Sequence, residues 1–138
     1  MGRSKSKMTI EFIMCRDQIN PKEVDSAYQK EYEEASKVSK VHLMDISNPS
    51  KMILPMNSKS IFVYQSWMQR PQHYKLMYDR ALSMGCHLIN SPEQYKACHW
   101  FEGWYHLIED MTPKSKIIKR AEVRPMMDEV LSFMKENN

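Results

Sequence analysis

Short apolar runs rich in β-branched residues alternate along this chain with longer segments that repeat apolar residues at helical spacing. Residues 8–14 and 60–67 are the clearest runs of the first kind, and shorter ones follow at 41–46 and 86–90. Apolar runs of this length with few charges are typical of buried parallel strands. Their alternation with helices predicts an open, mainly parallel, Rossmann-like α/β sheet flanked by helices on both faces.

Proline and capping residues mark where the intervening helices should begin and end. Asn20-Pro21 predicts a helix start, and apolar residues at helical spacing continue it over residues 24–38. Pro71 opens a second helix, and Gly85 stands where that helix should end. Ser91-Pro92-Glu93-Gln94 has the residues of a capping box, which predicts the start of a third helix.

The remaining segments give weaker signals. Residues 47–60 are rich in proline, asparagine and serine, which favours a loop, with a brief edge strand at 52–54. The third helix should run on to Ile108, and Gly103 should loosen it near Trp104. Residues 115–118 suggest a last strand, and apolar residues at helical spacing predict a final helix over residues 124–135.

Length and charge limit the classes of protein. The 138 residues fit a single domain over residues 8–138 behind a disordered basic leader at 1–7. The formal net charge is only +3, which argues against nucleic acid as a partner. A second basic cluster is more typical of a solvated surface than of a phosphate site; it comprises Lys114, Lys116, Lys119 and Arg120.

Cysteine usage and hydropathy indicate the compartment. Cys15, Cys86 and Cys98 are odd in number and follow no secretory segment, which argues against a disulfide framework. No apolar run approaches the about 20 residues that cross a bilayer, so no membrane is expected as a partner. We therefore expect a cytoplasmic protein.

Few residues carry the pattern of a metal or catalytic site. Cys86-His87 and Cys98-His99 have zinc-binding side chains, but their spacing does not fit a four-ligand zinc site. Neighbouring residues on a strand point to opposite faces, so Cys86 and His87 could not both face one metal ion. Cys98 should lie in the core, and all three thiols should be buried and inert. No glycine-rich phosphate loop is present. We expect no metal, no catalytic residue and no cofactor bound by the chain on its own.

An aromatic cluster at Trp100, Phe101, Trp104 and Tyr105 has two open roles. Trp100 and Trp104 lie one helical turn apart and therefore share a face. That face is either part of the core or, where it is exposed, a contact for a partner.

A set of short motifs over about residues 60–118 resembles the pre-ATP-grasp segment of certain ATP-grasp proteins of bacteria and their phages. The motifs are Trp67-Met68, Tyr74 to Tyr78, Gly85, Leu88-Ile89-Asn90-Ser91-Pro92-Glu93-Gln94-Tyr95, His99, Trp104-Tyr105, Leu107-Ile108-Glu109 and Thr112-Pro113-Lys114-Ser115. The resemblance implies a Rossmann-like layer that precedes an ATP-binding half. In the family that half supplies lysines for the nucleotide, ligands for magnesium and carboxylate–amine ligation. The stretch after Ser115 offers no positions that match those lysines and ligands.

Two functions follow from the resemblance. The first is a stand-alone protein-binding module, for example a phage-encoded modulator of a host protein, whose partner is another protein or a second copy. The second is a fragment or subunit of an ATP-grasp carboxylate–amine ligase, which would use ATP and magnesium once completed. Ligands of parallel sheets bind beyond the carboxyl ends of the strands. The candidate contacts at those ends and at the family junction are Arg16, Asp17, Gln65, Trp67, Asn90 and Lys114, with Trp100 and Trp104 added as partner contacts.

Overall fold

The computed structural model describes residues 8–118 and 123–137, in two compact units, one ending at Lys96 and the other beginning at Ala97. The single domain expected over residues 8–138 stays a prediction. The expected leader at 1–7 and the basic residues Lys119 and Arg120 lie outside the described residues. Within those ranges, no helix combines the length and apolar character needed to cross a bilayer.

The first unit contains the expected parallel sheet. Its strands are β1 (Ile10–Cys15), β2 (Val41–Met44), β3 (Ile61–Tyr64) and β4 (His87–Leu88), in the order β2-β1-β3-β4. All three pairings are parallel. The connection from β1 to β2 and the connection from β3 to β4 run in opposite directions across the sheet. Right-handed crossovers therefore put helices on both faces. The sequence prediction of an open Rossmann-like α/β fold is confirmed.

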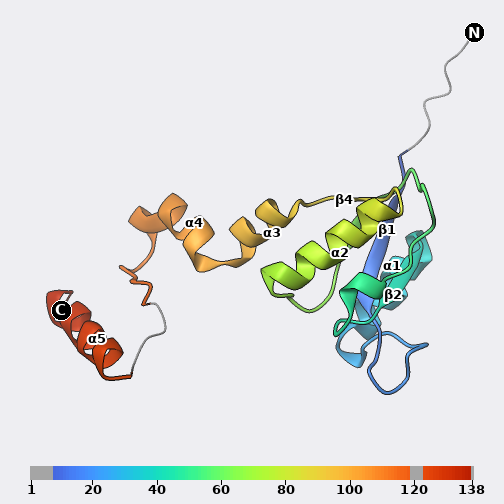
Figure 1. The fold of residues 1–138 in the computed structure, drawn as a ribbon. Helices are drawn as coiled ribbons and strands as arrows, with labels where there is room; N and C mark the ends of the chain where they lie inside the picture. The colour runs from blue at the N-terminus through green and yellow to red at the C-terminus, as the bar shows by residue number, and fades with distance from the viewer. Residues whose placement is uncertain (1–7, 119–122, 138) are drawn as a thin grey trace, which may run out of the picture. The chain divides into compact units, whose positions relative to one another are not determined.

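One face of the sheet forms the core with helix α2 (Pro71–Ser83), which runs alongside the strands in Figure 1. The fully buried residues come from both elements: Ile13, Cys15 and Phe62 from the sheet, and Tyr74, Met77 and Ala81 from α2. Tyr74 stacks on Tyr95, with ring centroids 3.8 Å apart. Gly85 ends the α2 region at φ 70°, a backbone conformation that glycine adopts without steric cost.

The segment between β1 and β2 differs from the expected helix at Asn20-Pro21. Asp17 Oδ1 accepts the backbone N–H groups of Ile19 and Asn20, each at 2.7 Å, which makes a local turn. Val24 then pairs with Arg16 in an antiparallel bridge and is buried. Helix α1 (Gln29–Val38) begins only after the 3₁₀ turn η1 (Ser26–Tyr28) and contacts β2 (Figure 1). Local side-chain hydrogen bonding and a tertiary contact replace the first turns of the expected helix.

The expected edge strand at 52–54 is not formed. The 3₁₀ turn η2 (Pro49–Lys51) packs against α2, and the chain that follows has no strand pairing. Met52 and Leu54 are buried there, and Arg80 Nε donates to the Met52 carbonyl over 3.0 Å. Of the three apolar residues that suggested a strand, Met52 and Leu54 are therefore buried and Ile53 is exposed.

The capping box at Ser91 is confirmed. The Ser91 N–H donates to Gln94 Oε1 over 2.9 Å, and the Gln94 N–H donates to Ser91 Oγ over 3.2 Å. The helix α3 (Pro92–His99) that follows is shorter than expected, because Trp100 is extended at φ −99° and ψ 127° and separates α3 from α4 (Phe101–Ile108). At Gly103 a Cβ would lie 2.6 Å from the Ala97 carbonyl oxygen, so this corner requires glycine.

The second unit is mainly helical. After α4 it contains the 3₁₀ turn η3 (Glu109–Met111) and helix α5 (Val123–Glu136), which matches the expected final helix. The suggested strand at 115–118 is absent; the Ser115 N–H donates instead to Tyr105 Oη over 2.9 Å. Lys116 forms an ion pair with Glu129 at 3.0 Å. Cys98, expected in the core, is exposed.

A polar cluster joins three strands near their amino ends. The Glu11 carboxylate lies 2.6 Å from His42 Nε2 and accepts the Ser60 hydroxyl at 2.7 Å. The side chains of His42 and Glu11 are only 18% and 12% exposed. Burial alone would raise the pKa of Glu11. The hydrogen bonds outweigh burial and hold this pKa below its ordinary value.

Replacing Glu11 should destabilise the sheet at neutral pH but not in acid. Hydrogen bonds to charged groups contribute roughly 1.5–3 kcal/mol, so we expect Glu11→Gln to lower the free energy of unfolding by about 1–2 kcal/mol at pH 7. Because the pKa of Glu11 is lower in the folded state, its carboxylate contributes its full stabilisation above the ordinary pKa of 4.5. That stabilisation is lost as the pH falls through the lower pKa of the folded state. Urea unfolding at neutral and acidic pH checks this, with the exposed Glu23→Gln as control. An equal loss at both pH values would contradict it.

Candidate functional site

The carboxyl edge of the sheet holds two features on either side of β1. The strand order reverses direction between β1 and β3, and such switch points are where open α/β sheets bind ligands. Residues after β1 and β3 form an aromatic cluster on one side. Residues after β1 and β2 line a cavity on the other.

Trp67 is the centre of the aromatic cluster. Its indole Nε1 donates to Asp25 Oδ2 over 2.9 Å, and its ring meets Tyr28 edge-on with centroids 5.3 Å apart. The Tyr64 hydroxyl donates to the Trp67 carbonyl over 2.5 Å, which fixes the backbone. Although it is held in this way, Trp67 is 47% exposed. We call Asp25, Tyr28 and Trp67 the edge cluster.

The loop after β1 positions the edge cluster. The bridge between Arg16 and Val24 folds this loop back, and the Asp25 N–H donates to the Cys15 carbonyl over 3.0 Å. On the β3 side, Ser66 Oγ accepts the Cys15 N–H at 3.1 Å. The two loops are therefore tied to the same strand end, which brings Asp25 within reach of Trp67.

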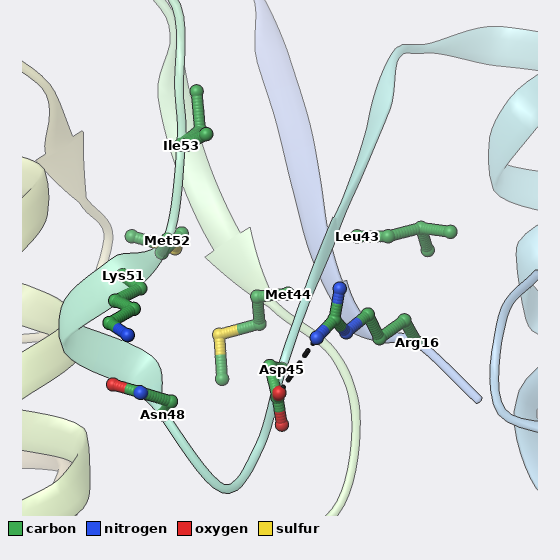
Figure 2. A pocket seen from close by; sticks show the side chains of 8 residues that line it. All are labelled: Arg16, Leu43, Met44, Asp45, Asn48, Lys51, Met52 and Ile53. Atoms are coloured by element: carbon green, nitrogen blue, oxygen red, sulfur yellow. Dashed lines mark hydrogen bonds and ion pairs between the residues drawn. The ribbon is translucent and has the colours of Figure 1, made fainter. Parts of the chain in front are cut away.

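The cavity beside β2 has a volume of about 360 Å³ (Figure 2). It is lined by Arg16, Leu43, Met44, Asp45, Asn48, Lys51, Met52 and Ile53. Figure 2 shows Arg16 reaching Asp45 from one side, while Asn48 and Lys51 extend from η2 on the other. The lining combines two cationic side chains, one carboxylate and several aliphatic groups, which suits a small anionic ligand with an apolar part.

Asp45 is the fixed negative charge of this cavity. Its Oδ1 accepts the Ser47 hydroxyl at 2.6 Å and the Ser47 N–H at 2.9 Å, and its Oδ2 pairs with Arg16 at 2.8 Å. The Ser47 hydroxyl first, and the Arg16 guanidinium second, lower the pKa of Asp45 to about 2. The carboxylate therefore stays ionised at physiological pH and holds Arg16 in place rather than moving a proton.

The other titratable groups at this edge are suited to structure rather than chemistry. Cys15 is buried, its Sγ lies 3.4 Å from Tyr64 Oη, and burial raises the pKa of both groups. Neither group is ionised near neutral pH. Among the described residues, no three His, Cys, Asp or Glu side chains gather so as to hold a metal ion. The arrangement is suited to binding.

The candidates from sequence divide among different roles. Arg16 lines the cavity and Trp67 forms the edge cluster. Asp17 closes its own loop, as described above. Gln65 and Asn90 are exposed; the Gln65 N–H donates to the Ile13 carbonyl over 3.0 Å, and the Asn90 carbonyl accepts the Tyr74 hydroxyl at 3.0 Å.

Three further candidates lie in the second unit. Trp100 and Trp104 are half-buried, so neither of their two open roles is decided, and Lys114 is exposed. Phe101 lies against Trp104 and Tyr105, with centroids 5.1 Å and 4.6 Å apart. These contacts make a small aromatic cluster within the unit itself.

The residues that sequence reasoning missed are Asp25, Tyr28 and Lys51. Asp25 and Tyr28 fall inside the expected helix, where Tyr28 belongs to the predicted apolar stripe. Lys51 falls in a segment read as loop. The sequence places Asp45 to Ser47 at the end of the second predicted strand, but that signal does not extend to Lys51 or to Asp25.

Known proteins give no further guide to this site. Comparison with protein families, with curated proteins and with solved structures finds no match for the chain. The fold defines an open parallel-sheet α/β protein, and the resemblance to a pre-ATP-grasp segment stays a prediction.

The Ser47 hydroxyl should lower the pKa of Asp45 more than the Arg16 guanidinium does. In Ser47→Ala we expect the carboxyl pKa of Asp45 to rise from about 2 toward 3.8, and in Arg16→Ala we expect a smaller rise. Carbon-detected NMR titration of the Asp45 carboxyl measures both. A larger rise in Arg16→Ala than in Ser47→Ala would show that the ion pair dominates.

Proposed function

We propose that this chain is a protein-binding module that presents Trp67 to a partner protein at the carboxyl edge of its sheet. The observation that carries the proposal is an indole that is held by Asp25 and Tyr28 and is still about half exposed. Tryptophan is enriched among the residues that dominate binding energy at interfaces. A side chain already fixed in place loses little freedom on binding, which favours affinity.

Other exposed side chains on the loops after β1 and β3 support a protein partner. Ile19, on the loop after β1, and Met68, beside Trp67, are 94% and 61% exposed. Gln65 and Arg70 on the same β3–α2 loop are polar and exposed. Large apolar groups with polar neighbours are the usual composition of a protein interface.

The resemblance fits this role. In the family, the pre-ATP-grasp segment is a Rossmann-like layer without the nucleotide lysines and metal ligands, which is compatible with a binding role for this unit. A phage-encoded modulator that engages a host protein is the form of the proposal that the resemblance favours, and it acts without a cofactor.

Truncating Trp67 should abolish most of the affinity for the partner. The partner is identified by affinity capture from the native cell extract with mass spectrometry, and binding is then measured between purified proteins by calorimetry. A tryptophan at the centre of an interface contributes roughly 2 kcal/mol or more, so we expect Trp67→Ala to weaken binding about 30-fold. Its backbone carbonyl, which accepts from Tyr64, is retained in the variant.

The matched control is Val38→Ala. Val38 is also a large exposed apolar residue, but it lies at the end of α1, away from the edge cluster. Its truncation should leave affinity within about twofold, as expected for a residue outside the contact. Circular dichroism confirms that both variants fold. Unchanged affinity of Trp67→Ala for the captured partner would refute the proposed site.

The cavity beside β2 favours a second function, that of a subunit or fragment of an ATP-grasp carboxylate–amine ligase. The lining has two positive charges, on Arg16 and Lys51, and one negative charge, on Asp45. The net positive charge favours a carboxylate or a phosphate as ligand. In this alternative ATP and magnesium would bind mainly to the missing half.

NMR titration with small carboxylates and with inorganic phosphate tests the second function. Backbone shifts confined to the lining of the cavity, and lost in Lys51→Ala, are the expected result. Hydrolysis of ATP by the purified chain with magnesium and a small amine would instead contradict the stand-alone binding module. No shift with any of these ligands would remove the ligase alternative.

A further inference from the structure

Helix α5 carries an apolar stripe that faces solvent in the described part of its unit. Met127, Leu131 and Met134 are 52%, 48% and 53% exposed. Their spacings of four and three residues, at about 100° per residue, keep them within roughly 60° of one another around the helix. Apolar residues repeated in this way are the pattern of a helix–helix seam.

The stripe is not the side of α5 that faces its own unit. Met126, Val130 and Phe133 are half-buried and lie about 90° from the stripe in one direction. Glu129 lies further round on that side and forms its ion pair with Lys116. The helix therefore has a second apolar strip beyond the one turned toward its own unit.

Charges border the stripe in a self-complementary way. Asp128 and Lys135 are both exposed, and both lie about 80–100° from Met127 on the flank opposite the half-buried residues. When two copies of a helix pack antiparallel, the same flank of each meets the other. Asp128 then faces Lys135 of the second copy, and the pair occurs twice. In a parallel arrangement unlike flanks meet, and this pairing is lost.

We propose that the stripe is the seam of an antiparallel homodimer, with Leu131 close to the two-fold axis. The seam is isologous, as a two-fold dimer requires, because Met127 packs against Met134 of the second copy and the reverse. One four-turn helix pair is smaller than a standard interface of about 1,600 Å², so the dimer should be weak, in the micromolar range or above. The inference does not depend on the role of Trp67.

Analytical ultracentrifugation of the full chain, from about 1 µM to about 1 mM, measures the association. Leu131→Glu should leave only monomer. Asp128→Lys and Lys135→Asp each place like charges opposite one another and should weaken the dimer roughly tenfold. The double variant Asp128→Lys with Lys135→Asp restores opposite charges and should regain wild-type association.

Glu136→Lys is the matched control, because it changes the net charge as Asp128→Lys does, on a side of the helix where Glu136 accepts from Ser132. It should leave association unchanged, and circular dichroism verifies the helix in every variant. A chain that stays monomeric at all concentrations overturns the proposal, as does a dimer that survives Leu131→Glu. A double variant no better than the single ones overturns the antiparallel arrangement.

Discussion

The structure of the first unit depends on the pairing of β1 with parallel neighbours on both sides. Through these pairings β1 fixes the register of β2 and β3, and its residues Ile13 and Cys15 are fully buried. Because the connections run outward from β1 and β3 in opposite directions, the chain cannot cover the strand ends between them. The edge cluster lies at those ends, and the cavity lies on the other side of β1, beside the ends of β1 and β2.

One loop serves both features. Arg16 enters the cavity through its guanidinium, while its backbone bridges to Val24 and so brings Asp25 to Trp67. Each feature therefore includes the carboxyl end of β1, and its other residues come from a neighbouring strand or the loop after it. Sites built on a fixed strand end hold their geometry better than sites built wholly from loops.

Local sequence patterns predicted the strands, the capping box at Ser91 and the final helix, because each depends on residues close together in the chain. The helix expected at Asn20-Pro21 failed where a tertiary contact competed: Val24 is buried in a bridge rather than in a helix face. The edge cluster could not be predicted in full. Trp67 stood at a recognisable strand end, but its partner Asp25 lies 42 residues away and meets it only once the strand order is known.

The two proposed contacts would reinforce one another. The edge cluster belongs to the first unit and the α5 stripe to the second, so dimerisation need not occupy Trp67. Two copies joined through α5 present two indoles, and a partner that is itself dimeric or repetitive could engage both. The second contact would then form at a high effective concentration, which raises overall avidity by orders of magnitude without any new contact. A weak seam suffices for this, because the partner itself holds the two copies together.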